Sequence, residues 1–164
     1  MLVLIPVVVF VGVSGNDRER LPSALIGQKF PEFELPMLGS ERIATHRLLE
    51  GKPRLVNVWG TWCAACREEH GLLLKIAREF GIEIVGVNYR DDPDQAVAWL
   101  RDLGDPYVFD VLDREGSLGV DLGVYGAPET FLVDSERRIV LKHVGRLTPK
   151  VWADEFAPRI EGMQ

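Results

Sequence analysis

The sequence predicts a single α/β domain built on a mixed central sheet with helices on both faces. The chain has 164 residues, of which 46% are hydrophobic, and this length suits one domain with a sizeable core. Two nearly continuous apolar runs, 54–60 and 82–89, are typical of strands buried on both faces of a sheet. A segment with helical periodicity follows each run, and this alternation indicates an α/β fold.

The first half of the domain is predicted to hold a hairpin, a strand and a long helix. Residues 26–43 are punctuated by Pro31 and Pro36 into short extended pieces, which favours an N-terminal hairpin extension. The buried strand at 54–60 follows. From Ala64 to Phe80 the pattern is helical, and Gly81 ends it.

A second helix and a short insertion follow the strand at 82–89. Asp92 is expected to cap a helix that has Pro93 at its first position and that ends at Leu103, before Gly104. Residues 107–113 then read as a short strand and residues 114–124 as a short helix, which together form a small βα insertion.

The end of the domain is predicted to be a hairpin followed by a helix. Residues 130–134 and 138–145 are strand-like, and the polar turn between them makes the pair antiparallel. A final helix is expected over about 149–161.

The N-terminus differs in character from the domain, which we place at 25–164. Residues 2–13 carry no charge, and the polar residues 14–24 read as a linker. A bilayer-spanning helix needs roughly 20 apolar residues, and a signal-peptide core roughly 7–15. We therefore expect residues 1–13 to be an export segment or the end of a membrane anchor. The alternative is a buried core strand, although such a strand rarely opens a chain before a charged linker.

The charge distribution excludes one class of partner. The net charge is −6, and the sequence has no run rich in lysine or arginine. A nucleic-acid partner therefore has no electrostatic basis.

Cys63 and Cys66 are the only two cysteines, and four interpretations compete for them. A covalent haem site would need histidine after the second cysteine, but Arg67 stands there. A structural disulfide across two residues would close too small a loop to add much stability. A zinc site needs four ligands. The histidines that could complete such a site are His46, His70 and His143.

The fourth interpretation, a redox pair, meets its physical requirements. Cys63 is placed where a buried strand gives way to a helix, and a helix N-terminus stabilises a thiolate. Cys66 lies one turn into the helix and can resolve a mixed disulfide. This chemistry needs no metal and no organic cofactor.

The helix carries one acid on its apolar face. The apolar stripe of Leu73, Ile76, Ala77 and Phe80 projects back to Glu69, His70 and Cys66. Glu68 instead falls on the polar face. Glu69 is therefore either a buried proton acceptor close to the cysteines or a surface acid that reaches water.

Two motifs resemble the active site of the thioredoxin superfamily. "VNVWGTWCAACREE" resembles its strand, Trp-Cys-x-x-Cys turn and helix, and "GVYGAPETFLVD" resembles its loop with a cis-proline beside the cysteines. The match makes Pro128 the cis-proline. It implies a peptide groove formed by Trp62, Tyr125, Gly126, Ala127 and Pro128. The alternatives are that Pro128 only shapes the turn and that Trp62 only packs.

Over residues 20–160 the sequence resembles the membrane-anchored thiol-disulfide oxidoreductases of cytochrome c maturation, the CcmG/DsbE family. The resemblance implies a thioredoxin-like domain in the periplasm, held at the bacterial inner membrane by one N-terminal anchor. It also implies a reductant of the CxxCH cysteines of apocytochrome c that is re-reduced by a membrane electron donor. In the family, acidic residues near the disulfide influence its redox behaviour, and the matching positions are Glu69 and Glu129.

Two positions depart from the related patterns. Family members often have proline between the cysteines, where this chain has Ala64 and Ala65, and this leaves the redox potential open. Thioredoxins carry a buried aspartate six residues before the first cysteine, where this chain has Asn57. Asn57 cannot take a proton, although it can hydrogen-bond within the sheet, so Glu69 becomes the nearest candidate acceptor.

The expected reaction is dithiol-disulfide exchange. Cys63 attacks the substrate disulfide, and Cys66 resolves the intermediate with help from Glu69 or Glu129. One rival is another activity on the same fold, a thiol peroxidase or a general periplasmic thiol reductase. A rival of another class is a metal- or haem-binding module that uses the CxxC pair as ligands.

Overall fold

The computed structural model describes residues 23–163. The segment 1–13 and nearly all of the linker lie outside these residues, so the expected anchor lies outside them too. Between residues 23 and 163, no helix has both the length and the apolar character that crossing a bilayer requires.

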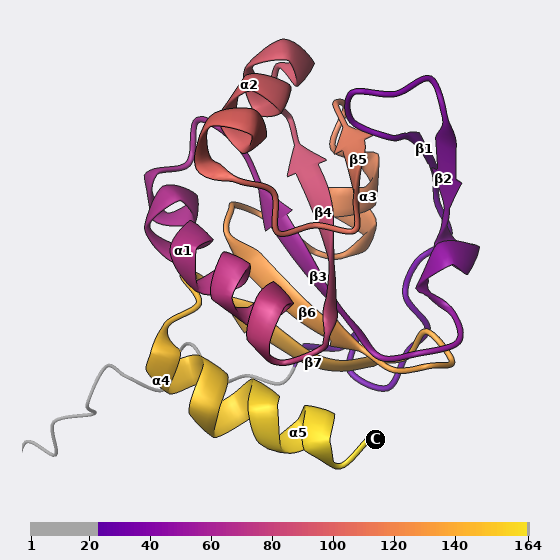
Figure 1. The fold of residues 1–164 in the computed structure, drawn as a ribbon. Coiled ribbons are helices and arrows are strands. Elements are labelled where there is room, and N and C mark those ends of the chain that lie inside the picture. Colours follow the sequence, from indigo (N-terminus) through magenta and orange to yellow (C-terminus); the bar gives the residue numbers. More distant parts are fainter. Residues whose placement is uncertain (1–22, 164) are drawn as a thin grey trace, which may run out of the picture.

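A five-stranded mixed sheet forms the centre of the domain, in the order β5-β4-β3-β6-β7 (Figure 1). Its strands are β3 (Arg54–Trp59), β4 (Glu83–Tyr89), β5 (Phe109–Asp113), β6 (Glu129–Val133) and β7 (Ile139–Val144). Strands β3, β4 and β5 are parallel, whereas β6 runs antiparallel to β3 and β7 antiparallel to β6. The predicted mixed sheet and its terminal hairpin are confirmed.

The helices cover both faces of this sheet, as predicted. Helices α1 (Ala64–Glu79) and α2 (Pro93–Leu103) join parallel strands that are added in the same direction. Two right-handed crossovers in one direction place both helices on the same face. The C-terminal helical segments pack there as well, while α3 (Ser117–Asp121) and the N-terminal segment cover the other face.

The ends of α2 show how the sequence sets these helices. The Asp92 side chain accepts hydrogen bonds from the backbone N–H groups of Asp94 and Gln95, both at 3.0 Å. Gly104 ends the helix with a positive φ of 91°, a conformation that glycine adopts without a steric penalty. The cap and the stop expected from the sequence are thus both confirmed.

The N-terminal hairpin consists of β1 (Glu34–Pro36) and β2 (Ile43–Thr45), followed by the short 3-10 helix η2 (His46–Leu49). It adjoins the edge of the main sheet, because Met37 bridges to Val111 of β5. The hairpin extension predicted from the sequence is therefore confirmed, and it lies beside β5 in Figure 1.

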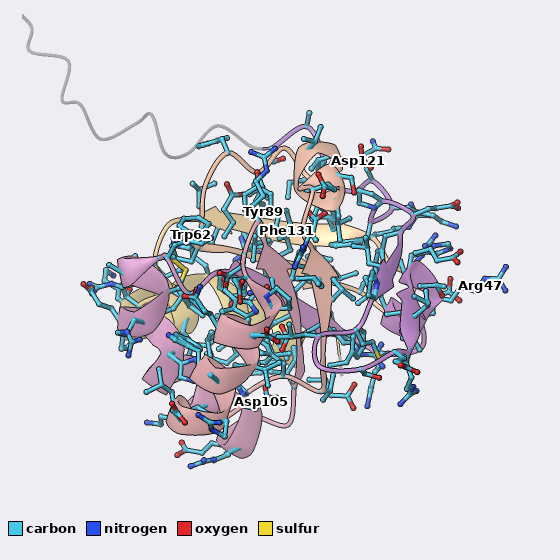
Figure 2. The ribbon with its side chains drawn as sticks, turned by 90° about the horizontal axis from the view of Figure 1, so that it is seen from above. Arg47, Trp62, Tyr89, Asp105, Asp121 and Phe131 are labelled. Carbon is cyan, nitrogen blue, oxygen red and sulfur yellow. A yellow bond between two sulfur atoms is a disulfide. The ribbon has the colours of Figure 1, made fainter. Side chains whose placement is uncertain are left out.

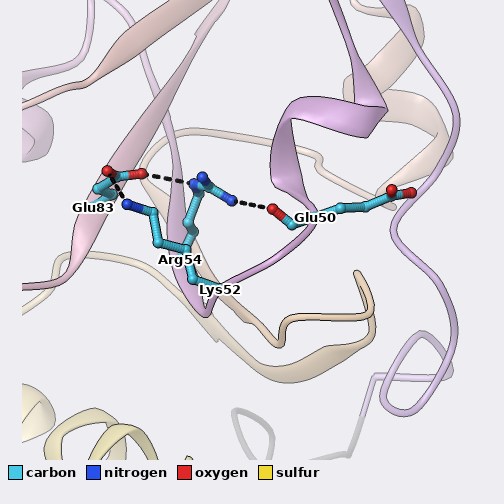
Figure 3. A network of polar contacts seen from close by, with 4 residues as sticks. All are labelled: Glu50, Lys52, Arg54 and Glu83. Carbon is cyan, nitrogen blue, oxygen red and sulfur yellow. Dashed lines mark hydrogen bonds and ion pairs between the residues drawn. The ribbon is translucent and has the colours of Figure 1, made fainter. Parts of the chain in front are cut away.

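The entry into the central strand is fixed by a small ionic network (Figure 3). Arg54 Nε donates to Glu83 Oε2 at 2.9 Å, and Lys52 pairs with the same carboxylate. Arg54 also donates to the carbonyl oxygen of Glu50 at 3.1 Å. Because Arg54 and Glu83 begin two adjacent strands, the network ties the start of β3 to the start of β4.

Two elements, β5 and α3, are shorter than the sequence predicted. The strand expected from residue 107 begins at Phe109, because the Asp105 side chain accepts the Tyr107 N–H in a turn. The helix expected over 114–124 shortens to α3, since Gly116 and Gly123 on either side have positive φ.

The last helix is not the single regular helix that the sequence predicted. It contains α4 (Pro149–Val151), a π-helical turn η3 (Trp152–Phe156) and α5 (Ala157–Glu161). Pro158 has no N–H for a regular helical hydrogen bond, and its ring crowds the carbonyl four residues earlier. The wider turn directly before this proline accommodates both effects.

Candidate active site

Cys63 and Cys66 form a disulfide at the N-terminus of α1. Cys63 is the N-cap residue, and its sulfur accepts a hydrogen bond of 3.0 Å from the Cys66 N–H. The Cys63 side chain is 5% exposed and Cys66 2% exposed, so both sulfurs sit in the core but Cys63 lies nearer the surface. The position predicted for Cys63 at the helix N-terminus is confirmed.

Trp62 lies beside the disulfide (Figure 2). It is 53% exposed, and its Nε1 donates to the carbonyl oxygen of Tyr89 at 3.2 Å. The indole also lies against Gly60, where an added Cβ would stand 2.5 Å from Nε1. Trp62 is thus held in place beside Cys63 with much of its surface exposed, and its part in a peptide groove stays a prediction.

The loop before β6 approaches the cysteines from the other side of the site. The Ala127–Pro128 peptide bond is cis, and Ala127 packs against the core cluster that contains both cysteines. Tyr125 is 84% exposed, Gly126 is half-buried and Pro128 is buried. The loop thus presents the exposed Tyr125 to solvent, while Ala127 reaches the core that holds the disulfide.

Glu69 is buried one helical turn from Cys66, on the apolar face of α1. Its carboxylate accepts hydrogen bonds from Asn57 Nδ2 at 2.9 Å and from the Leu147 N–H at 2.6 Å. Burial raises the pKa of Glu69 to about 7, and the two hydrogen bonds and the Arg146 charge offset only part of this effect. The alternative that Glu69 reaches water is wrong.

Asn57 connects Glu69 to the interior of the sheet. Its Nδ2 also donates to Thr130 Oγ1 at 3.1 Å, and its Oδ1 accepts from the Tyr107 hydroxyl at 2.8 Å. The expected hydrogen bonding of Asn57 within the sheet is confirmed. The amide acts as a fixed donor toward Glu69, so Glu69 is the group in this buried network that can change its charge near neutral pH.

Glu129 lies on the opposite face of the sheet from Glu69. Alternation along β6 places Thr130 on the Asn57 side and Glu129 on the side of Phe131. The Glu129 carboxylate is fully buried and pairs with Lys142 Nζ at 2.9 Å. Burial raises its pKa, and the Lys142 charge offsets part of this rise. The two predicted acids thus lie in different cores, on opposite faces of the sheet.

Glu68 and His70 each have a partner within the domain. Glu68 forms an exposed ion pair with Arg146, as its place on the polar face predicted. His70 Nε2 donates to the Gly104 carbonyl oxygen at 2.8 Å, and burial lowers the pKa of this histidine. From residue 23 to residue 163, no group of three or more His, Cys, Asp and Glu side chains is arranged to hold a metal ion.

Comparisons with known proteins agree with this geometry. The sequence profile described as Redoxin matches residues 25–155. A thiol:disulfide interchange protein DsbE from Escherichia coli strain K12 is 43% identical over 171 residues, which cover 96% of this chain and 92% of the relative. The DsbE of Pseudomonas aeruginosa is 50% identical over 143 residues, which cover 87% of this chain and 79% of that protein.

The chain belongs to the redoxin family, and within it to the DsbE-type proteins.

Solved structures of similar proteins support the same assignment. A secreted thiol-disulfide isomerase from Corynebacterium glutamicum has a TM-score of 0.70 at 26% identity, over 80% of this chain and 85% of that one. A structure described as a putative DsbE from Chlorobium tepidum has a TM-score of 0.64 at 27% identity, over 82% of this chain and 92% of that one. The thioredoxin-like fold is confirmed, and this redoxin is a thiol-disulfide oxidoreductase.

Several residues around the site of this redoxin escaped the sequence analysis. Asp110 is almost fully buried and accepts a hydrogen bond from Trp59 Nε1 at 2.8 Å. The sequence held a signal for this buried acid, because Asp110 interrupts an otherwise apolar strand. Tyr107, Lys142 and Asp91 gave no such signal, because their partners lie on distant segments.

Proposed function

We propose that this DsbE-type protein reduces the CxxCH disulfide of apocytochrome c during c-type cytochrome maturation. The proposal places the domain in the periplasm, held at the bacterial inner membrane by the N-terminal segment. Its support is the family membership together with the sequence "GVYGAPETF", which is the most specific part of the resemblance to the cytochrome c maturation proteins.

One observation carries the proposal for a polypeptide client. The disulfide lies between an exposed Trp62 and a cis-proline loop whose Tyr125 is exposed. An extended peptide can lie against the backbone of that loop and bring its own sulfurs to Cys63. A substrate as small as a peroxide needs no such surface.

The reaction transfers two electrons from the reduced enzyme to the client. The Cys63 thiolate attacks one client sulfur, forming a Cys63–client disulfide, and the other client sulfur leaves as a thiolate. The Cys66 thiolate then attacks the Cys63 sulfur, and the first client sulfur leaves. The client ends as a dithiol and the enzyme as the Cys63–Cys66 disulfide, which a membrane electron donor reduces again.

The proton of Cys66 has a nearby acceptor in this scheme. Desolvation makes the loss of a proton from a buried thiol costly. Glu69 lies one turn away on the same helix face, with a pKa raised to about 7 by burial. We assign Glu69 alone as the base for this step, because Glu129 lies on the opposite face of the sheet and pairs with Lys142.

Trapping of clients tests the proposal. The Cys66→Ala variant leaves the mixed disulfide unresolved, so apocytochrome c should accumulate on Cys63, and the Cys63→Ala variant should trap nothing. Loss of Cys63 should also impair c-type cytochrome assembly, and an added small thiol should partly restore it. Trapping of unrelated proteins alone would indicate a general thiol reductase, and rapid peroxide consumption at Cys63 would indicate a peroxidase.

A further inference from the structure

The Asp91 carboxylate, in the loop between β4 and α2, receives four hydrogen bonds. Thr61 donates its N–H at 2.6 Å and its hydroxyl at 2.6 Å. Asn88 Nδ2 and the Asp92 N–H each donate at 2.9 Å. Thr61 lies directly before Trp62, so this carboxylate holds the chain that leads into the active-site turn.

The same loop also holds the indole of Trp62, through the bond from Nε1 to the Tyr89 carbonyl oxygen. Between Tyr89 and Asp91 the chain turns at Arg90, which has a φ of 49°. A residue other than glycine adopts this left-handed conformation at a cost. The Arg90 N–H donates to the Asp113 carbonyl oxygen at 3.0 Å, which anchors the turn. Trp62 is thus fixed by contacts with a segment nearly thirty residues away.

Cys63 is held by contacts of a different kind. Its N–H donates to the Gly60 carbonyl oxygen at 3.1 Å, and its sulfur accepts from the Cys66 N–H. Both contacts are local and involve neither Asp91 nor Tyr89. Loosening of the Asp91 contacts should therefore release Trp62 without displacing the reactive sulfur.

We propose that Asp91 is a positioning residue that fixes Trp62 as a recognition surface for client polypeptides. The proposal rests on the peptide exchange described under the proposed function. Asp91 touches neither cysteine in the contacts above, so its influence acts through the orientation of Thr61 and Trp62.

The isosteric variant Asp91→Asn is a sharp test, because all four groups around the carboxylate are donors. Each carboxylate oxygen accepts one backbone N–H, from Thr61 on one side and Asp92 on the other. An asparagine amide must turn its N–H₂ group toward one of these N–H groups, so at least one bond is lost and two donors face each other. The expected result is a rise of about ten-fold in KM for a peptide disulfide, which follows from misplacement of a binding group. The rate with a small aromatic disulfide, which does not need the Trp62 surface, should stay at the wild-type value.

Asp92→Ala is the matched control. Asp92 adjoins Asp91 but caps α2 through Asp94 and Gln95. This variant should lower the melting temperature and leave KM for the peptide disulfide unchanged. Thr61→Val removes one of the four bonds and should raise KM by less than Asp91→Asn, so it tests the proposal even if Asp91→Asn folds poorly.

A double-mutant comparison with Trp62→Ala decides whether Asp91 acts through the indole. In the Trp62→Ala background the effect of Asp91→Asn on KM should vanish. An equal slowing with peptide and small disulfides, or an undiminished effect without Trp62, would overturn the proposal. The assay is independent of the client proposed above: a wild type that reduces CxxCH peptides no better than scrambled ones would reject that client and leave the Asp91 comparison intact.

Discussion

Asn57 donates a hydrogen bond of 2.9 Å to the carboxylate of Glu69 in the core below the disulfide. At the position where thioredoxins carry an aspartate, this chain therefore presents a neutral donor to an acid. A donor stabilises the charged carboxylate, yet burial still raises the pKa of Glu69 to about 7. The pair combines a fixed hydrogen-bonding partner with one group that can take up a proton near neutral pH.

The first prediction concerns the proton of Cys66. Glu69→Gln removes the base and should slow resolution of the mixed disulfide by about 10²–10⁴-fold, the usual contribution of general-base catalysis. In the wild type the rate should rise through pH of about 7, as Glu69 loses its proton, and in the variant this rise should be absent. Stopped-flow reduction of a CxxCH peptide disulfide across pH measures both effects.

The matched control for this experiment is Glu68→Gln. Glu68 neighbours Glu69 in the chain but faces water and pairs with Arg146. The Glu68→Gln variant should therefore resolve the mixed disulfide at nearly the wild-type rate. If both variants slow the reaction equally, the effect is one of general charge and not of a buried base.

The second prediction concerns Tyr107. Its hydroxyl donates to Asn57 Oδ1 at 2.8 Å and so fixes which end of the amide faces Glu69. Tyr107→Phe frees the amide to turn its oxygen toward Glu69, which favours the protonated acid. The midpoint of the pH–rate profile should therefore move above about 7. The shift must disappear in a Glu69→Gln background, and an unchanged midpoint in the single variant would show that other contacts orient Asn57.

The third prediction concerns stability and pH. The folded state raises the pKa of Glu69 from 4.5 to about 7, so the folded protein binds this proton more tightly than the unfolded chain. The stabilisation that this proton gives to the folded state is fully present below pH of about 4.5 and is lost as pH rises through about 7. The free energy of unfolding should fall by about 3 kcal/mol in total over this range. Urea unfolding of the oxidised protein should show this loss. Glu69→Gln has no acid at this position and should lack this loss, so the difference between the two proteins should change between pH of about 4.5 and about 7. A difference that stays constant over this range would refute the buried-acid assignment.

The fourth prediction concerns the buried pair of Glu129 and Lys142. Lys142 also donates to the carbonyl oxygens of Leu122 and Gly123, before the cis-proline loop. Lys142→Met strands a buried carboxylate and should lower the free energy of unfolding by about 3–5 kcal/mol. The double variant Lys142→Met with Glu129→Gln should recover part of this loss in thermal melts. No recovery would mean that the bonds to the loop carbonyls, and not the ion pair, supply the stability.

The sequence predicted the order of the elements because their signals are local. Caps such as Asp92, stops such as Gly104 and the apolar stripe of α1 depend on neighbouring residues. The stripe also put Glu69 on the apolar face of the helix, although it left open whether the carboxylate reaches water. The π-turn before Pro158 could have been anticipated from that proline.

The partners of the site residues could not be predicted in this way. Glu69 receives a bond from Leu147, 78 residues further along the chain, and that contact depends on how the chain crosses back after β7. The opposite placement of Glu69 and Glu129 likewise depends on the register of β6, which pairs Asn57 with Thr130. Such relationships arise from the packing of the sheet and not from any single segment.

The central sheet separates the residues around the site into two hydrophobic cores, one on each face. One core surrounds the cysteines and Glu69, and the other supports Glu129 and Lys142 next to the loop that ends at Pro128. Substitutions in separate cores usually add without interfering. Substitutions around Lys142 can therefore reshape the loop before Pro128 while the surroundings of the cysteines and Glu69 stay unchanged.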